Sequence, residues 1–247
     1  MRYFIQVTYD GLQYAGFQIQ PNATTIQSKL TQALQVILKQ PVTLTGSSRT
    51  DAKVHAHSNY FMLDIAVITN IPKLIYSLNA LLPPTIAVIN IQAVQPHAHA
   101  RFSATSRCYT YHITTVKNPF LQHRAYYYPY QLNVQLLHHA ASSLATQVHF
   151  KHFCKTNTQV NNYNCTLIQS FWQVLPTGYI YTVQANRFLR GMVKALVGTS
   201  LQLATGKLNS QQFQTLFTHT PTAVANFTPP GYGLYLQQVH YPPSVFL

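Results

Sequence analysis

Only three side chains of this 247-residue chain can be carboxylates, those of Asp10, Asp51 and Asp64, because the sequence contains no glutamate. A reaction that needs a general base, a carboxylate nucleophile or an acidic metal site must therefore draw on them. Asp51 stands in SSRTDAKVHA, a polar, turn-like stretch between two strand-like runs. Loops carry functional residues more often than cores do, so Asp51 is the first candidate for chemistry. The alternative is that it accepts local backbone N–H bonds and only caps a turn.

A second candidate group interleaves arginines and tyrosines between Arg101 and Tyr111. Side chains alternate along a strand, so Arg107, Tyr109 and Tyr111 would share one face. Such a face suits RNA, because cations contact phosphates while an aromatic ring stacks on an unpaired base. The alternative is a half-exposed strand with ordinary aromatic packing.

A third group is a stripe of cations on a helix expected over 187–204. Arg187, Arg190 and Lys194 are spaced i, i+3 and i+7, opposite apolar residues at core spacing. A stripe of this kind is commonly a solvated face. The acids that would balance it are missing here, so we expect it to face either phosphate or Asp51.

The composition is strongly basic: 16 lysines and arginines against three acids give a formal charge of +13 and a pI near 9.8. Such a field attracts polyanions, so nucleic acid or an anionic membrane surface is the natural partner, unless the charge is simply solvated. The three cysteines lack CxxC spacing and the histidines lack ligand partners. We therefore expect neither a disulfide framework nor a metal site. The protein is expected to reside in a reducing cytoplasm. No signal-like start or apolar run of ~18–20 residues predicts a membrane segment.

The elements that must position these groups follow an α+β order twice. The first half predicts strands over 1–9, 42–46, 55–65 and 86–94 and helices over 25–39 and 72–82. The second half predicts strands over 107–115, 166–174, 178–185 and 233–240 and helices over 132–145, 187–204 and 210–217. We therefore predict an α+β fold of two similar, ferredoxin-like halves with mixed or antiparallel sheets. A domain over 1–104 would carry the Asp51 loop, and one over 105–247 would complete a central active-site cleft.

These segments together resemble the tRNA pseudouridine synthase A family, whose motif GRTDAGVHA is similar to SSRTDAKVHA. The likeness covers nearly the whole chain: YDG at 9–11, GFQIQ at 16–20, LNALLP at 78–83, HARF at 99–102, RCYTY at 107–111, NRFLRGMVK at 186–194 and GLYL at 233–236. Each segment alone is a weak signal. All of them in the family's order are specific.

The resemblance implies a cofactor-free isomerase that makes pseudouridine in the anticodon stem-loop of tRNA, at positions 38–40. In the family an aspartate attacks the target uridine, and the base detaches, rotates and rejoins the ribose through C5. Asp51 takes this role by motif match. Tyr109 matches the tyrosine that stacks on the flipped uracil, and Leu234 matches an apolar pocket wall.

Further residues follow from the same resemblance. Arg49 matches the arginine that holds the target nucleotide out of the base stack. Extruding a base from that stack costs roughly a few kcal/mol. Lys194 stands where the family has an arginine that pairs with the catalytic aspartate and keeps it ionised. We expect Arg101, Arg107 and Arg190 to add contacts to the RNA. The resemblance also implies a homodimer in the cytoplasm, with tRNA as the partner and no membrane association.

The chain departs from the family pattern at Ser48, Lys53 and Lys194. Lys194 supplies charge but not the planar, bidentate fork of arginine. Ser48 and Lys53 replace two motif glycines, which implies strain wherever the backbone needs a positive φ. Two alternatives to the enzyme therefore stay open: an RNA-binding relative that binds tRNA without turnover, and a basic structural component of a ribonucleoprotein.

Overall fold

The computed structural model describes residues 1–156, 160–218 and 220–247 and divides into two compact units. The first unit comprises 1–107 and 235–247, and the second comprises 108–234. The C-terminal strand therefore groups with the N-terminal residues, whereas the sequence analysis placed it in the second domain. Strands and helices alternate in both units, and most of the strand pairs are antiparallel, which confirms the α+β class.

The sheet of the first unit is built around β1 (Arg2–Tyr9). β1 pairs antiparallel with β3 (His55–Asp64) on one side and with β4 (Ile86–Val94) on the other. The short β2 (Leu44–Gly46) pairs antiparallel with the end of β3, and β9 (Leu234–His240) pairs parallel with its start. The four strands predicted in the first half are therefore confirmed, and β3 emerges directly from the Asp51 loop.

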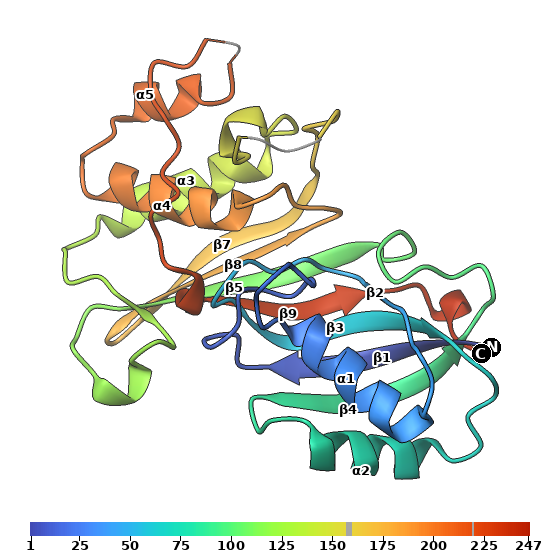
Figure 1. The fold of residues 1–247 in the computed structure, drawn as a ribbon. Helices are drawn as coiled ribbons and strands as arrows, with labels where there is room; N and C mark the ends of the chain where they lie inside the picture. Colours follow the sequence, from blue (N-terminus) through green and yellow to red (C-terminus); the bar gives the residue numbers. More distant parts are fainter. Residues whose placement is uncertain (157–159, 219) are drawn as a thin grey trace. The chain divides into compact units, whose positions relative to one another are not determined.

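Two helices pack beside this sheet (Figure 1), and both predicted helices are confirmed. α1 (Ile26–Leu38) begins with a capping box, in which the side chain of Thr25 accepts from Ser28 N–H and Ser28 caps Thr25 in return. Its apolar stripe is buried: Ile26, Leu30, Ala33 and Leu34. α2 (Ile71–Leu81) starts at the Asn70 cap and packs on β4 and α1. Local capping and periodicity suffice to place both helices.

A core cluster of the first unit includes Phe4 of β1 together with buried residues of the turn after β4 and the chain terminus. It comprises Phe4, Val94, Ala98, Ala100 and Val245, with Tyr60, Met62, Tyr241 and Phe246 against it. The short helix η4 (Pro243–Val245) brings the C-terminal residues onto this cluster. The cluster anchors the segment that contains the HARF motif.

The second unit combines strands β5 (Ser106–Thr114), β6 (Tyr126–Tyr127), β7 (Leu167–Leu175) and β8 (Gly178–Ala185). Its helices are α3 (Val134–Ala145), α4 (Met192–Ala204) and α5 (Ser210–Thr215), with three short 3-10 helices η1 (Pro119–Leu121), η2 (Lys151–Phe153) and η3 (Gly231–Gly233). β7 and β8 form the predicted hairpin, α3 packs on β7 and α4 packs on α3. β6 was not predicted, because two residues carry no usable periodicity.

The predicted start of the helix over 187–204 is wrong, since α4 begins only at Met192. Gly191 caps it in the left-handed region, with φ +72, so the helix cannot continue backward through this residue. Arg187 and Arg190 therefore lie in a loop, and no helical stripe joins them to Lys194. α4 is buried on nearly every side, and only Lys194 and Gln202 among its 13 residues are partly exposed.

None of the helices in the described residues has the length and apolar character needed to span a membrane.

Candidate active site

The three carboxylates have different surroundings. Asp64 forms a bidentate ion pair with Arg2, with Nε–Oδ1 and Nη2–Oδ2 distances of 2.7 and 2.8 Å. The hydrogen bonds from Arg2 hold the pKa of Asp64 below its usual value. Asp10 Oδ1 accepts from Leu12 N–H at 3.0 Å and lies 3.0 Å from Nδ1 of His55. Asp51 is half-buried, and within the described part of its own unit its carboxylate has no such partner. Two of the three acids therefore serve local structure, and Asp51 is left as the candidate for chemistry.

The loop that carries Asp51 joins β2 to β3 and is held by a buried amide. Asn59, fully buried on β3, donates to the carbonyl of Ser48 at 2.9 Å and accepts from its N–H at 3.3 Å. The same amide donates to the hydroxyl of Tyr9 at 3.1 Å, and this hydroxyl lies 2.7 Å from Oγ1 of Thr50. Residues 48 and 50 are thus tied to β1 and β3 immediately before Asp51.

Two glycines let the N-terminal motifs approach this loop closely. A Cβ on Gly11 would lie 1.9 Å from the carbonyl oxygen of Val54, where no side chain fits. Gly16 has φ +122, and a Cβ there would lie 3.0 Å from the Thr50 carbonyl, which accepts from Phe17 N–H at 3.1 Å. The YDG and GFQ segments therefore act as a backbone support for the Asp51 loop.

The two departures within the motif differ in their consequences. Lys53 is exposed and has φ +65, in the left-handed region that the motif glycine tolerates without strain. Ser48 has no positive φ, but its hydroxyl is buried and lacks a hydrogen-bond partner among the described residues. The expectation of backbone strain is therefore met at Lys53, whereas Ser48 leaves a polar group unsatisfied.

We expect Lys53→Gly to raise the free energy of unfolding by about 0.5–1 kcal/mol, because relief of the left-handed penalty exceeds the added chain entropy. Urea denaturation measures the change. Lys73→Gly in the first turn of α2 is the matched control and should instead destabilise by about 0.5–1 kcal/mol. A loss of stability in Lys53→Gly would show that its backbone is not strained.

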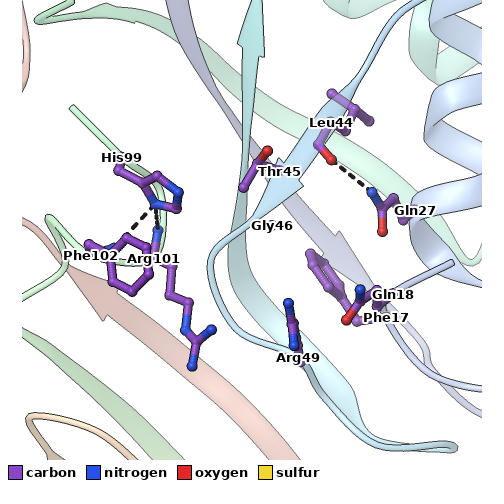
Figure 2. A pocket seen from close by; sticks show the side chains of 10 residues that line it. All are labelled: Phe17, Gln18, Gln27, Leu44, Thr45, Gly46, Arg49, His99, Arg101 and Phe102. Carbon is purple, nitrogen blue, oxygen red and sulfur yellow. Dashed lines mark hydrogen bonds between the residues drawn. The ribbon is translucent and has the colours of Figure 1, made fainter. Parts of the chain in front are cut away.

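A hollow of about 280 Å³ opens beside the Asp51 loop in the first unit (Figure 2). Its lining residues come from the GFQ segment, α1, β2, the Asp51 loop and the HARF turn: Phe17, Gln18, Gln27, Leu44, Thr45, Gly46, Arg49, His99, Arg101 and Phe102. Arg49 and Arg101 are both exposed and line it from different segments. The structure thus brings together two of the predicted substrate-binding arginines in the neighbourhood of Asp51.

The turn over 95–103 is fixed from several directions. Arg2, braced by Asp64, donates through Nη1 to the carbonyl of Ala98 at 2.8 Å. Arg107 donates to the carbonyls of Ala104, at 3.2 Å, and Arg101. These bonds give Arg107 a structural role in shaping the turn, besides the RNA contact that we predicted for it.

In the second unit, Tyr109 lies on β5 with a buried side chain. Its ring meets that of Phe188 edge to face, with centroids 5.1 Å apart. The hydroxyl of Tyr111, two residues on, donates to the carbonyl of Pro230 at 2.8 Å. A Cβ on Gly233 would lie 2.7 Å from that ring, so glycine permits this close packing just before the buried Leu234.

The cations of the second unit occupy different settings. Lys194 is half-buried in the first turn of α4, where the helix dipole disfavours a cation. Arg190 is exposed, and its carbonyl accepts from Lys155 N–H at 2.9 Å. A cation kept at an unfavourable helix end among buried residues is consistent with a functional role for Lys194.

Sequence reasoning missed Asn59, His99 and Phe102 as parts of the site. HARF stands out as a motif, but nothing in the sequence alone shows that its histidine and phenylalanine line a hollow with Arg49. Asn59 carries no motif signal. The one available hint was a polar residue within the apolar alternation of β3. Among the described residues, no group of three or more His, Cys, Asp or Glu could hold a metal ion.

Comparison with known proteins places these features in context. Residues 140–242 match the model of the family described as tRNA pseudouridine synthase. The tRNA pseudouridine synthase A of Parabacteroides distasonis is 39% identical over 246 residues, covering 99% of this chain and 98% of the relative. The enzyme of the same name from Bacillus subtilis is 34% identical over 245 residues, covering 98% and 99%.

Proposed function

This chain belongs to the tRNA pseudouridine synthase A family, and on that premise we propose that it isomerises uridine to pseudouridine in the anticodon stem-loop of tRNA. The observation that carries the proposal is the setting of Asp51. Among the described residues of the first unit, the carboxylates of Asp10 and Asp64 have hydrogen-bond or ion-pair partners, whereas that of Asp51 has none. Asp51 also lies in a loop that hydrogen bonds tie to two strands. The formal charge of +13 suits a polyanionic substrate.

In the proposed reaction the carboxylate of Asp51 attacks the target uridine and the N1–C1′ bond breaks. The uracil rotates, C5 bonds to C1′ and the bond that Asp51 formed to the uridine breaks, which restores the carboxylate. The hydrogen on C5 leaves as a proton and N1 takes up a proton. Product and substrate are therefore isomers. The rigid support from Asn59 and Tyr9 keeps the nucleophile oriented, so that little conformational entropy is lost when the substrate binds.

We propose that residues of both units serve this reaction. Arg49 holds the extruded nucleotide, the Tyr109 ring stacks on its base and Leu234 supplies an apolar wall. Lys194 is the charge partner of Asp51, while Arg101, Arg107 and Arg190 contact the RNA backbone. The buried Tyr109 ring, the buried Leu234 and the half-buried Lys194 support these assignments.

The architecture that we propose has the two similar, ferredoxin-like halves expected from the sequence. We propose that the domain over 1–104 carries the catalytic loop and that the one over 105–247, whose last residues 235–247 group with the first unit, completes the site. We also propose that the protein acts as a homodimer, as the family resemblance implies. We place it in the cytoplasm because tRNA is its substrate.

Release of tritium from tRNA labelled at uridine C5 tests the reaction directly, because the new C5–C1′ bond expels that hydrogen. We expect the full chain to release tritium from a tRNA transcript in proportion to pseudouridine formed. Binding of the transcript without any release would instead identify an RNA-binding relative that has lost turnover. Equal affinity for tRNA and unrelated RNA, with a steep salt dependence, would favour a structural ribonucleoprotein component.

We expect Lys194→Arg to keep or raise kcat/KM for tritium release, and Lys194→Gln to lower it about 100-fold. The charge next to the nucleophile is retained in the first variant and removed in the second. Lys207→Gln, at an exposed cation of the same unit, makes the same charge change and should leave the rate within about twofold. A clear loss in Lys194→Arg would mean that Lys194 does not act on Asp51 through its charge.

A further inference from the structure

The hollow beside the Asp51 loop contains two side chains, those of Phe102 and His99, that the proposed chemistry at the target uridine does not use. Phe102 lines it with 74% of its surface exposed. The Arg101 guanidinium lies 5.5 Å from the centroid of this ring, and the ring of His99 lies 4.5 Å from it. An exposed aromatic ring next to a guanidinium is an arrangement that binds an unpaired base and its phosphate.

We infer that this hollow is a binding site for a second nucleotide of the tRNA, the unpaired nucleotide next to the target uridine. Its base would stack on Phe102 and Arg101 would contact its phosphate, while Arg49, which holds the extruded uridine, lines the same hollow from the catalytic loop. This inference rests on the proposed function, since the ligand is a neighbour of the uridine on which Asp51 acts. The assignment concerns the flanking nucleotide and leaves the target base with Tyr109 and Leu234.

The donors around the hollow are set by the local backbone. Nδ1 of His99 accepts from the N–H groups of Arg101, at 3.0 Å, and Phe102, at 3.4 Å. Nε2 of His99 therefore carries the proton in the neutral ring and is a donor. Burial, together with the charges of Arg2 and Arg101, lowers the pKa of His99. The site therefore offers a neutral N–H donor and two guanidinium groups, a set suited to phosphate and base edges.

The floor of the hollow is preformed. The Phe17 ring stacks on Phe61 with centroids 4.3 Å apart, and a Cβ on Gly46 would lie only 2.2 Å from Phe17. The Gln27 side chain donates to the carbonyl of Leu44 at 2.8 Å and accepts from Ile19 N–H at 3.0 Å. These contacts join α1, β2 and the GFQ segment, so ligand binding needs little rearrangement of the walls. A volume of about 280 Å³ suits one nucleotide and excludes a duplex.

The position of the hollow selects which nucleotide it holds. Arg49, on its rim, stands two residues before Asp51 in the loop that Asn59 and Tyr9 fix. Successive nucleotides of an extruded strand are covalently linked, so the neighbour of a uridine at Asp51 is the part of the RNA best placed to reach Arg49. The hollow would thereby set the register of the strand at the catalytic loop.

A thermodynamic cycle on the full chain tests this inference. We use Asp51→Asn protein, so that the RNA is not modified, and measure its Kd for a tRNA transcript with and without Phe102→Ala. Abasic sites replace, singly, the nucleotides immediately 5′ and 3′ of the target. We expect Phe102→Ala to weaken binding about tenfold, as loss of one stacked base does. With the protein that retains Phe102, one of the two abasic transcripts should bind about tenfold more weakly than the intact transcript. With the Phe102→Ala protein, the same abasic transcript and the intact transcript should bind equally well.

The inference is overturned if each abasic transcript loses the same factor in affinity with the protein that retains Phe102 and with the Phe102→Ala protein, because the ring then contacts neither base. Tyr76→Ala is the matched control, since Tyr76 is a 75% exposed aromatic residue on α2 that does not line the hollow, and its Kd should not change. Arg101→Gln should reduce the slope of log affinity against log salt by about 0.7–0.9, one phosphate contact, while Lys73→Gln should not. An unchanged slope in Arg101→Gln would remove the phosphate from the inference.

The cycle and the tritium assay fail independently of each other. Coupling between Phe102 and one flanking base, without tritium release from the unmutated chain, would keep this binding site and reject the isomerase. Tritium release without coupling would keep the isomerase and reject the second-nucleotide site.

Discussion

Asp51→Asn is expected to reduce tritium release from C5-labelled tRNA by at least about a thousandfold and to leave the Kd for tRNA within about twofold. An amide of the same size cannot attack the uridine as a carboxylate can, so covalent catalysis is lost while shape is retained. The supporting hydrogen bonds involve the backbone of Ser48 and the side chains of Thr50, Tyr9 and Asn59, none of which the substitution changes. The folded structure should therefore persist.

Asp64→Asn is the matched control for this experiment, because it removes the same charge from the same unit. The Asp64 carboxylate pairs with Arg2 at the surface, so its loss should cost at most about 1 kcal/mol of stability and leave the rate within about twofold. Comparable rates in Asp51→Asn and unmutated protein would contradict the nucleophile assignment. Unfolding of the Asp51→Asn protein would instead show that Asp51 is a structural cap.

Asn59→Ala is expected to lower the free energy of unfolding by about 2–4 kcal/mol and to reduce the rate of tritium release in the protein that remains folded. Its amide makes buried bonds to both backbone groups of Ser48 and to the Tyr9 hydroxyl, and a part-buried one to Tyr60 N–H. Truncation deprives the buried N–H and carbonyl of Ser48 of this partner, and each unsatisfied group costs about 1–3 kcal/mol. Urea denaturation, with the midpoint and slope fitted separately, measures the change.

Asn90→Ala, at an exposed asparagine on β4, should change stability by less than about 0.5 kcal/mol and serves as the control. Tyr9→Phe deletes one hydroxyl of the network and should give an intermediate loss. If Asn59→Ala costs no more than Asn90→Ala, the buried amide does not hold the loop, and the rigidity proposed for Asp51 has another origin.

Local signals in the sequence predicted most of the secondary structure. The alternation of β1, the Thr25 cap with the stripe of α1, and the run of β4 each depend on residues close together in the chain. The scarcity of acids singled out Asp51, and the ordered motifs identified the family. Such features follow from residue type and short-range spacing, which a single sequence displays in full.

The start of α4 could not be read in the same way. The spacing of Arg187, Arg190 and Lys194 fits a helix, but the left-handed conformation of Gly191 ends that helix before it reaches them. Glycine is compatible with both outcomes, and in the folded chain Lys155 N–H donates to the Arg190 carbonyl next to this left-handed glycine. A backbone choice of this kind depends on tertiary partners that spacing does not encode.

The sequence by itself therefore determined the order of elements, the basic charge, the family and the candidate nucleophile. Only the tertiary structure showed that Asn59 clamps the loop before Asp51, that Lys53 adopts a positive φ and that residues 235–247 join the first unit. It alone placed Phe102 and Arg101 beside Arg49 at one hollow. The physical reason is range: buried hydrogen bonds and packed rings join residues about 10 to 140 positions apart, and chain-local patterns carry no record of such pairings.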